Sequence, residues 1–363
     1  MGRKKEQESA IDVLRIVSEG TGISLIEDME ELTYFQTMLT GYNRATGIGG
    51  HPRKRATVIH GPNQVGKSVL ALALAESARR IGDAAVVFDT EYAGEREWYN
   101  AISPKCGFHQ PEDLDELFGK IQKMLDNLEK AKRSKSKDSK LSKDVGCFFV
   151  VDTLTKLFPK NILEKIEKEG VDKMYPLQAA YISTWMKSLI PQLARTNSDL
   201  VLVMQERENV NKQGFFDKDY KVTGGKAVMY DNCVRVRVTS ASRVKKGDAT
   251  VGSKIRYTVE NNKVDGTSFE KSVFFTSNGK GDLPKGLDLV AEAVEEMKER
   301  GSFRKLKRKR KGESVDVIEV NLSEDEVVEI EGGMKDVESY FRESVEDFGR
   351  FVDNLNAEAR RMS

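Results

Sequence analysis

The first two thirds of the chain alternate between continuous apolar runs and segments of helical periodicity. Four runs of strand length are almost entirely apolar: ATVIHG (56–61), AAVVFDT (84–90), CFFVVDT (147–153) and LVLVMQ (200–205). Such runs are typical of strands that are buried on both faces of a sheet. Between them, apolar residues recur at helical spacing over 69–81 and 112–130. Strands that alternate with helices predict a parallel sheet with helices on both faces.

From about residue 233 to 276 the pattern changes to a period of two. The segments CVRVRVTS, SKIRYTVE and KSVFFTS each alternate apolar and polar residues, which is typical of half-buried strands. They predict antiparallel strands added at one edge of the sheet, and 285–300 then returns to helical spacing. The expected fold class is therefore α/β, with a mainly parallel sheet and antiparallel edge strands.

The N-terminal segment is predicted to be mostly helical. Apolar residues over 9–42, including Phe35 and Leu39, recur at helical spacing, and Gly20 and Gly22 predict a break. This segment is a candidate for oligomerisation.

Three regions are expected along the chain. A helical or oligomerisation segment covers 1–45, a core covers 46–277, and a C-terminal region covers 278–363. Within the core, a basic, serine-rich stretch at 130–144 has seven Lys or Arg and no apolar period. It predicts a solvated loop.

Charge dominates the sequence beyond Arg304. The run RKLKRKRK (304–311) has seven basic residues in eight, and 313–363 has 15 acidic and 5 basic residues, a net charge of −10. Because the whole chain carries +1, the residues before that acidic stretch carry +11. A final helix is predicted at about 334–361. Four large apolar residues in it recur every seven positions, typical of a helix that packs on its own domain: Met334, Phe341, Phe348 and Leu355.

This charge asymmetry leaves two interpretations open. A basic body with an acidic tail favours nucleic acid as a partner, whereas a solubilising tail on an ordinary enzyme would have the same composition. The basic run fits either a non-specific grip on duplex DNA or a linker. A flexible acidic tail lying close to the basic run would restrain access to duplex DNA, since charges act over only about 8 Å at physiological salt.

Composition excludes several classes of protein. Hydrophobic residues make up 39% and charged residues 32% of the 363 residues, so a core can form and a disordered or fibrous chain is excluded. There is no run of 18 apolar residues to span a membrane, and the first ten residues lack the apolar region of a secretory signal. Three scattered cysteines indicate a reducing compartment. The expected location is the cytoplasm, and neither the cysteines nor the three histidines show metal-ligand spacing.

The most specific motif is GPNQVGKS (61–68), which matches G-x-x-x-x-G-K-[ST] between a predicted strand and a predicted helix. Backbone N–H groups of such a loop wrap phosphate oxygens, and the helix N-terminus adds its positive dipole end. Lys67 is expected to reach the β- and γ-phosphates and Ser68 to ligate Mg²⁺. The predicted cofactors are ATP and Mg²⁺. The expected phosphate-loop residues are Gly61, Pro62, Asn63, Gln64, Val65, Gly66, Lys67 and Ser68.

Two acids at strand ends fit the same site. Asp152 ends the strand CFFVVD, where a Walker B aspartate holds the Mg²⁺ shell, although many strands end in Asp. Glu91 ends VVFDTE and is a candidate to deprotonate the attacking water, although without the phosphate loop it would be an ordinary surface carboxylate.

Five segments, in order over roughly residues 35–277, resemble the RecA family. They are GGHPRKRATVIHGPNQVGKS (49–68), DTEYAGEREWY (89–99), VVDTLTKLFP (150–159), LVMQER (202–207) followed by TGGKAVMY (223–230), and VRVRVTSASR with VGSKIRYTVENNK (251–263). The resemblance implies a RecA-type P-loop core and a divergent, phage-encoded recombinase acting in the host cytoplasm. Such a protein is a DNA-dependent ATPase that coats single-stranded DNA, pairs it with duplex DNA and exchanges strands.

The resemblance also implies individual roles around ATP. Glu91 matches the glutamate that activates water, and Trp98 falls where the family places an aromatic ring against adenine, unless it is a core tryptophan. Gln205 matches the glutamine that senses the γ-phosphate. Lys263 matches a lysine that reaches ATP across the protomer interface, unless it is a solvated strand lysine. The family has a second such lysine where this chain has Asn261, so hydrolysis is expected to be slower or less dependent on DNA.

Two DNA-binding loops are implied by the resemblance, around 169–176 and 206–223. In such loops, Met or aromatic tips wedge between bases, and basic side chains hold phosphates. Acidic and basic residues balance in the second loop, so its assignment depends on the resemblance. The candidate tips are Met174, Phe215 and Phe216, and the candidate phosphate contacts are Arg207, Lys212, Lys218 and Lys221.

Two other functions remain open. A hexameric helicase with the same fold would form closed rings, and a recombinase paralogue would bind DNA or a partner while barely hydrolysing ATP. A KaiC-like signalling ATPase is disfavoured, because the TGG-terminated loop after Gln205 has little purpose there. The expected partners are single-stranded and double-stranded DNA and further copies of the chain, in a helical filament or a ring, with no membrane.

Overall fold

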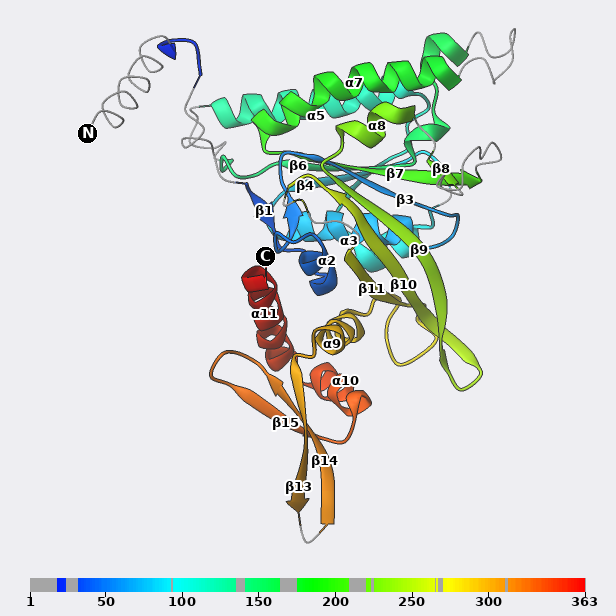
Figure 1. The fold of residues 1–363 in the computed structure, drawn as a ribbon. Coiled ribbons are helices and arrows are strands. Elements are labelled where there is room, and N and C mark those ends of the chain that lie inside the picture. Colours follow the sequence, from blue (N-terminus) through cyan, green and yellow to red (C-terminus); the bar gives the residue numbers. More distant parts are fainter. Residues whose placement is uncertain are drawn as a thin grey trace, which may run out of the picture. The chain divides into compact units, whose positions relative to one another are not determined.

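The computed structural model describes residues 18–23, 32–92, 94–134, 141–163, 175–208, 220–222, 225–264, 266, 270–310 and 313–362. The chain divides into two compact units, Met1–Thr33 and Tyr34–Ser363. All the elements below belong to the second unit, which is drawn in Figure 1.

A ten-stranded sheet forms the centre of this unit, in the order β12-β11-β10-β9-β3-β7-β6-β4-β5, with β8 paired to β7 (Figure 1). Six neighbouring strands are parallel to one another: β9, β3, β7, β6, β4 and β5. Strands β10, β11 and β12 are antiparallel to their neighbours. The predicted parallel sheet with antiparallel edge strands is confirmed. The strands are β3 (Ala56–Gly61), β4 (Ala84–Asp89), β5 (Gly107–His109), β6 (Cys147–Asp152), β7 (Asp199–Glu208), β8 (Tyr220–Val222), β9 (Val234–Lys246), β10 (Ala249–Asn262), β11 (Glu270–Ser277) and β12 (Gly286–Leu287).

Helices cover both faces of the sheet, as predicted. Ile59 and Val150 pack in the core on the side of α3, whereas their neighbours Val58 and Phe149 pack in the core that contains α5 and α7. This alternation explains the continuous apolar runs, because every residue of a central strand is buried. No helix in the described part of the chain is long and apolar enough to cross a membrane. The helices are α3 (Lys67–Arg80), α4 (Arg96–Ile102), α5 (Leu114–Arg133), α7 (Tyr175–Thr196) and α8 (Gly225–Asp231).

The basic stretch at 130–144 is partly helical. Helix α5 begins after Asp113, whose side chain accepts a hydrogen bond from the Glu116 N–H, and it continues to Arg133. The first four residues of the predicted loop are therefore its last turn, and 135–140 lie outside the described residues.

The predicted N-terminal helix is wrong for residues 34–39. Here β1 (Tyr34–Phe35) pairs with β2 (His51–Pro52), and helix α2 (Thr40–Ala45) begins only at Thr40. Phe35 and Leu39 are both buried, so their spacing reflects the burial of a non-helical segment. Most of the earlier part of the predicted helix lies outside the described residues.

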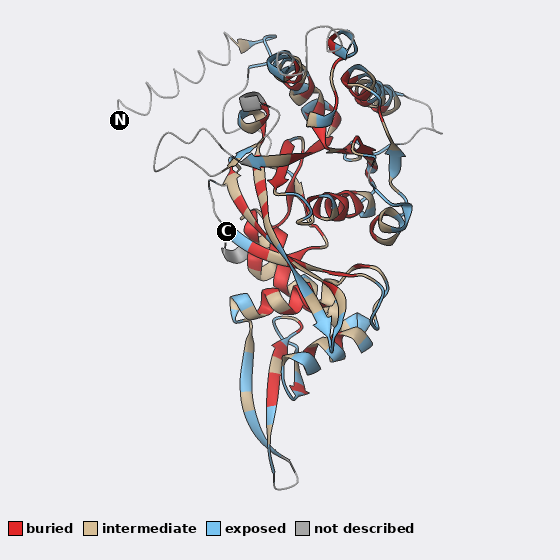
Figure 2. Cartoon of the chain, turned by 90° about the vertical axis from the view of Figure 1, so that its right-hand side faces the viewer, coloured by how far each residue is buried: buried red, intermediate tan, exposed pale blue. Residues whose placement is uncertain are grey.

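The C-terminal region is a folded α/β structure, and the expectation of a flexible acidic tail is wrong. The basic run forms a strand, the acidic stretch supplies two more strands of the same antiparallel sheet, and the single predicted helix is two helices that meet at Ser344. In Figure 2 the described residues next to the β13–β14 turn, 307–309 and 313–314, are exposed. The elements are α9 (Leu289–Arg300), β13 (Phe303–Arg310), β14 (Glu313–Asn321), β15 (Val327–Glu331), α10 (Met334–Glu343) and α11 (Val345–Met362).

A separate apolar core holds this region together. Val294 and Met297 of α9 pack with Ile318 of β14 and with the rings of Phe341 and Phe351. Those two rings are stacked, with centroids 4.5 Å apart. The four residues at seven-residue spacing all belong to this core, which confirms that the helices pack on their own domain.

Buried polar contacts attach the C-terminal region to the core of the molecule. Glu292 of α9 accepts hydrogen bonds from Thr40 and Gly41 at the start of α2. Asn43 of α2 also donates to Asn356 of α11 over 3.0 Å. The C-terminal helices are therefore packed against the segment that precedes the phosphate-loop strand.

Candidate nucleotide-binding site

The phosphate loop connects the end of β3 to the start of α3 and packs against β9 and β10. At Gly61, with φ 156°, a Cβ atom would lie 2.1 Å from the carbonyl oxygen of Val238. At Gly66, with φ 96°, it would lie 2.6 Å from the Ile255 side chain. Both motif glycines are thus required by the close approach of β9 and β10 as well as by the backbone conformation.

Lys67 is the first residue of α3, and its side chain is largely buried under the loop. Its ammonium group donates a hydrogen bond to the Pro62 carbonyl oxygen. Burial lowers the pKa of Lys67, and the carboxylates of Asp152 and Glu91 oppose this shift. The predicted phosphate-binding lysine therefore lies between the loop and the acidic strand ends, whereas Asn63 and Gln64 at the loop tip are exposed.

Asp152, at the end of β6, lies beside the first turn of α3. The Ser68 side chain lies close enough to its carboxylate to oppose a rise in its pKa. Burial raises the pKa of Asp152 to about 6, and the nearby carboxylates of Glu91 and Asp89 add to this effect. A bound cation would relieve this crowding of negative charge.

The oxygen donors of this pair fit Mg²⁺. Mg²⁺ is bound by few protein oxygens together with water and substrate phosphates, rather than by a cage made only of protein ligands. A hydroxyl and a carboxylate next to a phosphate loop provide such a partial ligand set. In the described part of the chain no three His, Cys, Asp or Glu side chains form a metal cluster.

Glu91 and Gln205 meet at the same edge of the sheet. The Gln205 amide donates a hydrogen bond to the Glu91 carboxylate, and Gln205 pairs with Gly61 across β3 and β7. Asp89 fixes the start of the segment that carries Glu91 by accepting hydrogen bonds from the backbone N–H groups of Glu91 (3.0 Å) and Tyr92 (3.1 Å). Residues predicted separately as base and sensor are therefore in direct contact.

A cleft of about 410 Å³ opens beside these groups, with Trp98 of α4 on its wall. The ring of Trp98 is partly buried against the core, and its face lies 4.9 Å from the Lys285 ammonium. Lys285 in turn pairs with Glu97. Trp98 thus both lines the cleft and contacts the core. The remaining lining residues are Ser68, Val69, Leu72, Asp89, Glu91, Gly94, Glu95, Tyr99, Ile102 and Asp152.

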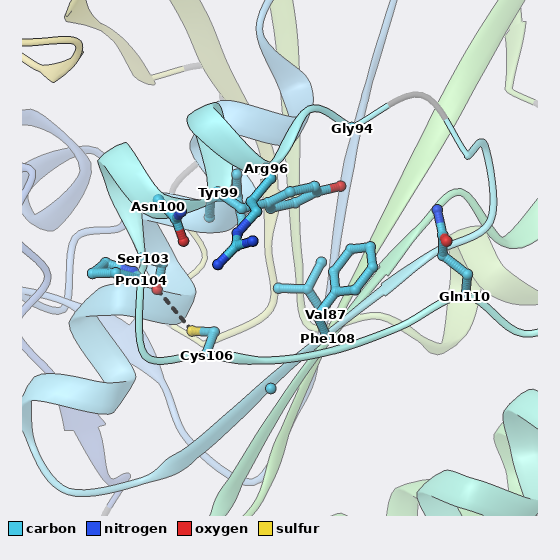
Figure 3. A pocket seen from close by; sticks show the side chains of 12 residues that line it. Val87, Gly94, Arg96, Tyr99, Asn100, Ser103, Pro104, Cys106, Phe108 and Gln110 are labelled. Carbon is cyan, nitrogen blue, oxygen red and sulfur yellow. Dashed lines mark hydrogen bonds between the residues drawn. The ribbon is translucent and has the colours of Figure 1, made fainter.

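A second cavity, of about 370 Å³, shares Leu72, Gly94 and Tyr99 with the lining of this cleft (Figure 3). Burial raises the pKa of Tyr99, and the nearby carboxylate of Asp89 adds to this effect. In the second cavity Ser103 and Cys106 lie within 2.7 Å of one another. No phosphate-loop residue lines it, so the first cleft is assigned to the nucleotide. The sequence patterns did not single out Asp89 or Tyr99, although both adjoin predicted site residues.

The predicted DNA-binding residues are only partly described. Arg207 and Lys221 face one another on β7 and β8 and are both exposed, and the Arg207 guanidinium lies 6.0 Å from the centre of the Tyr175 ring. The structure brings these two predicted residues together at the base of the second loop. Met174, Lys212, Phe215, Phe216 and Lys218 lie outside the described residues.

Lys263 lies just beyond β10, away from the cleft of its own chain. Its exposed ammonium donates a hydrogen bond to the Tyr230 carbonyl oxygen. Asn261, where a second lysine was expected, pairs with Arg235 across β9 and β10.

Comparison with known proteins gives a consistent result. A family model described as the RecA N-terminal domain matches residues 15–281. The protein RecA of Bordetella avium is 27% identical over 305 residues, which cover 82% of this chain and 79% of the relative. RecA of Clostridioides difficile is 29% identical over 72% of this chain and 70% of the relative. A mitochondrial DNA repair protein, the recA homolog of Dictyostelium discoideum, is 29% identical over 70% of this chain and 51% of the relative. The chain belongs to the RecA family.

Proposed function

We propose that this protein is an ATP-dependent recombinase that coats single-stranded DNA, pairs it with a homologous duplex and exchanges strands. The observation that carries the proposal is the direct contact between Glu91 and Gln205 beside the phosphate loop. It joins the group that would act on water to the strand that leads into the second DNA loop. The names of the relatives, RecA and DNA repair protein, agree with this function.

The chain's own residues would divide the work of ATP hydrolysis. Backbone N–H groups of 61–68 and the α3 N-terminus would hold the phosphates, and Lys67 would contact the β- and γ-phosphates. Ser68 and Asp152 would hold Mg²⁺, which supplies charge neutralisation when bound. Glu91 would accept the proton of the attacking water, oriented by the Gln205 amide.

DNA binding would be coupled to ATP through β7. This strand carries Gln205 and then Arg207, before the loop whose candidate tips are Phe215 and Phe216. A γ-phosphate contact at Gln205 would bias the strand that begins the loop, so each ligand would change the affinity for the other. With Lys263 reaching the ATP of a neighbouring protomer and Asn261 in place of a second lysine, the trans contribution would be weaker than in a protein with both lysines.

Electron microscopy and turnover together test this function. With ATP and single-stranded DNA we expect helical filaments and strand exchange, and Lys67→Ala should abolish turnover because it removes the charge at the phosphates. Glu91→Gln should retain ATP binding but stall hydrolysis and lock filaments on DNA, with the exposed Glu97→Gln as the matched control. Closed rings with directional unwinding would instead identify a helicase. DNA binding with negligible turnover in the wild-type protein would identify a paralogue.

We also propose a phage origin and action in the host cytoplasm. The identity of 27–29% to the cellular relatives supports a divergent member of the family. Genes next to its coding sequence should encode phage structural or replication proteins; a chromosomal housekeeping context would contradict this origin.

A further inference from the structure

A cluster of five neighbouring polar, charged and aromatic side chains lies directly behind the phosphate loop. His60, the residue before Gly61, has its Nδ1 atom 2.8 Å from Glu206 and its Nε2 atom 3.3 Å from Glu260. Its side chain is fully buried. Each ring nitrogen of this one histidine therefore faces a carboxylate, and the two carboxylates come from different strands.

Arg237 and Tyr220 complete the cluster. The Arg237 guanidinium donates two hydrogen bonds to Glu206, of 2.8 and 3.0 Å, and lies 3.9 Å from the centre of the Tyr220 ring. The Tyr220 hydroxyl then donates to Glu260 over 2.9 Å. We call these five side chains the His60 cluster.

The contacts of Glu206 favour its ionised form. Burial would raise its pKa, but hydrogen bonds from His60 and Arg237 outweigh this effect and lower the pKa below its ordinary value. A forked guanidinium–carboxylate pair is directional as well as strong. Glu206 is thus held at a fixed position relative to β3 and β9, although the sequence analysis placed it in a DNA loop.

The position of the His60 cluster in the fold indicates what it does. Glu206 follows Gln205, and Tyr220 begins the strand by which the chain returns from the second loop. Across β7 and β8, Glu206 pairs with Val222 and Glu208 with Tyr220. The cluster therefore includes a residue at each end of that loop, and its His60 immediately precedes the phosphate loop.

We infer that the His60 cluster is a positioning device that couples DNA at the second loop to the nucleotide at Gln205. This inference depends on the proposed function and names the residues that regulate the same site. A displacement of Gln205 by the γ-phosphate is passed to Glu206 and, through Arg237 and Tyr220, to the return strand of the loop. Glu206 does this without touching DNA, since its side chain is only 4% exposed.

The test compares coupling rather than activity alone. In Glu206→Gln, an amide nitrogen faces a guanidinium N–H, so the fork to Arg237 is lost. We expect the gain in single-stranded-DNA affinity on adding a nonhydrolysable ATP analogue to fall at least about fivefold, the lower end of allosteric coupling. The stimulation of ATP turnover by DNA should fall by a similar factor. Affinity for the analogue without DNA and the melting temperature control for folding.

Two further variants separate coupling from a merely structural role. Glu270→Gln breaks an ion pair between the exposed Glu270 of β11, in the same sheet, and Arg44 of α2, and should leave the coupling intact. Arg237→Gln should reproduce the loss, and the double variant with Glu206→Gln should be no worse than either single one, because the two side chains act through one contact. Equal losses with and without DNA, or additive losses in the double variant, would overturn the inference.

The same measurements keep the two proposals distinguishable. If the analogue strengthens DNA binding in the wild-type protein and equally in Glu206→Gln, the proposed function stands and the His60 cluster is not the coupling device. If the analogue leaves wild-type DNA affinity unchanged, both proposals are refuted, since there is no coupling to transmit.

Discussion

The buried carboxyl group of Glu292 offers a sharp test of how the C-terminal region is attached. Helix α2 has Leu39 at its N-cap and no side-chain cap of its own. Glu292 takes that place: one oxygen accepts from the Thr40 N–H (3.2 Å) and hydroxyl (2.9 Å), and the other accepts from the Gly41 N–H (2.7 Å). A residue of α9 therefore caps a helix that precedes it by some 250 positions.

The cost of Glu292→Gln follows from these contacts. An amide nitrogen cannot accept a hydrogen bond, so donors of either Thr40 or Gly41 lose their partner in a site without water access. A buried unsatisfied donor costs about 1–3 kcal/mol, and loss of an N-cap costs about 0.5–2 kcal/mol. Because both figures describe the same hydrogen bonds, they are not added, and we expect about 1–3 kcal/mol in total. At about 2–4 °C per kcal/mol for a large domain, the melting temperature should fall by about 2–12 °C.

The pH dependence gives a second, independent readout. Burial raises the pKa of Glu292 to about 8, against the hydrogen bonds from Gly41 and Thr40. Between the ordinary value of 4.5 and 8 the folded state holds a proton that the unfolded state releases, so wild-type stability falls as pH rises through this window. Glu292→Gln lacks that share of the slope, and its deficit should shrink towards pH 8. Melting curves parallel to those of the exposed control Glu299→Gln at every pH would refute the capping argument.

Three further predictions concern DNA, the phosphate-loop helix and the C-terminal region. Replacing Phe215 and Phe216 with Ala should weaken single-stranded-DNA binding by about 1–3 kcal/mol per lost stack in fluorescence anisotropy; unchanged affinity would move the DNA site elsewhere. Burial opposes ionisation of Glu76, but hydrogen bonds led by Arg79 outweigh it and lower the pKa to about 2. Its stabilisation is therefore present above the ordinary value of 4.5 and lost as pH falls towards 2, so Glu76→Gln should lower the melting temperature at pH 7 but not near pH 2. Deleting 313–363 should lower the melting temperature and leave duplex affinity unchanged or weaker, because it removes a folded core; a stable protein with tighter duplex binding would show that these residues act as a restraint.

The strands and the convergence of the site could be predicted because both depend on local pattern. A central strand of a parallel sheet is buried on both faces, so β3 has the same limits as the run at 56–61. The carboxyl ends of such strands meet at one edge, so an acid or amide that ends a strand falls near the phosphate loop. Asp152 ends β6, and Gln205 lies where the parallel pairing of β7 with β3 ends.

The supporting groups could not be predicted, because their partners are distant in sequence. Nothing near His60 marks it as the neighbour of Glu206, which is 146 residues away. Lys285 lies against Trp98 only because the segment before β12 packs on α4. For the same reason, the spacing of Phe35 and Leu39 could be mistaken for a helix, since burial of a loop and burial of a helix face leave similar apolar positions.

The C-terminal region shows why charge counted by segment is a poor guide to structure. In the run 304–311 only Leu306 is apolar, so the alternation of a strand is hidden. The strand is nevertheless paired along its length with the acidic segment, and Lys307 lies opposite Asp316. The basic and acidic stretches thus share one antiparallel sheet. Exposed pairs of this kind contribute only about 0–1 kcal/mol each, so the fold depends on the apolar core beneath them. Because these acidic residues are built into strands and helices, any duplex contact by β13 would not require a tail to be displaced.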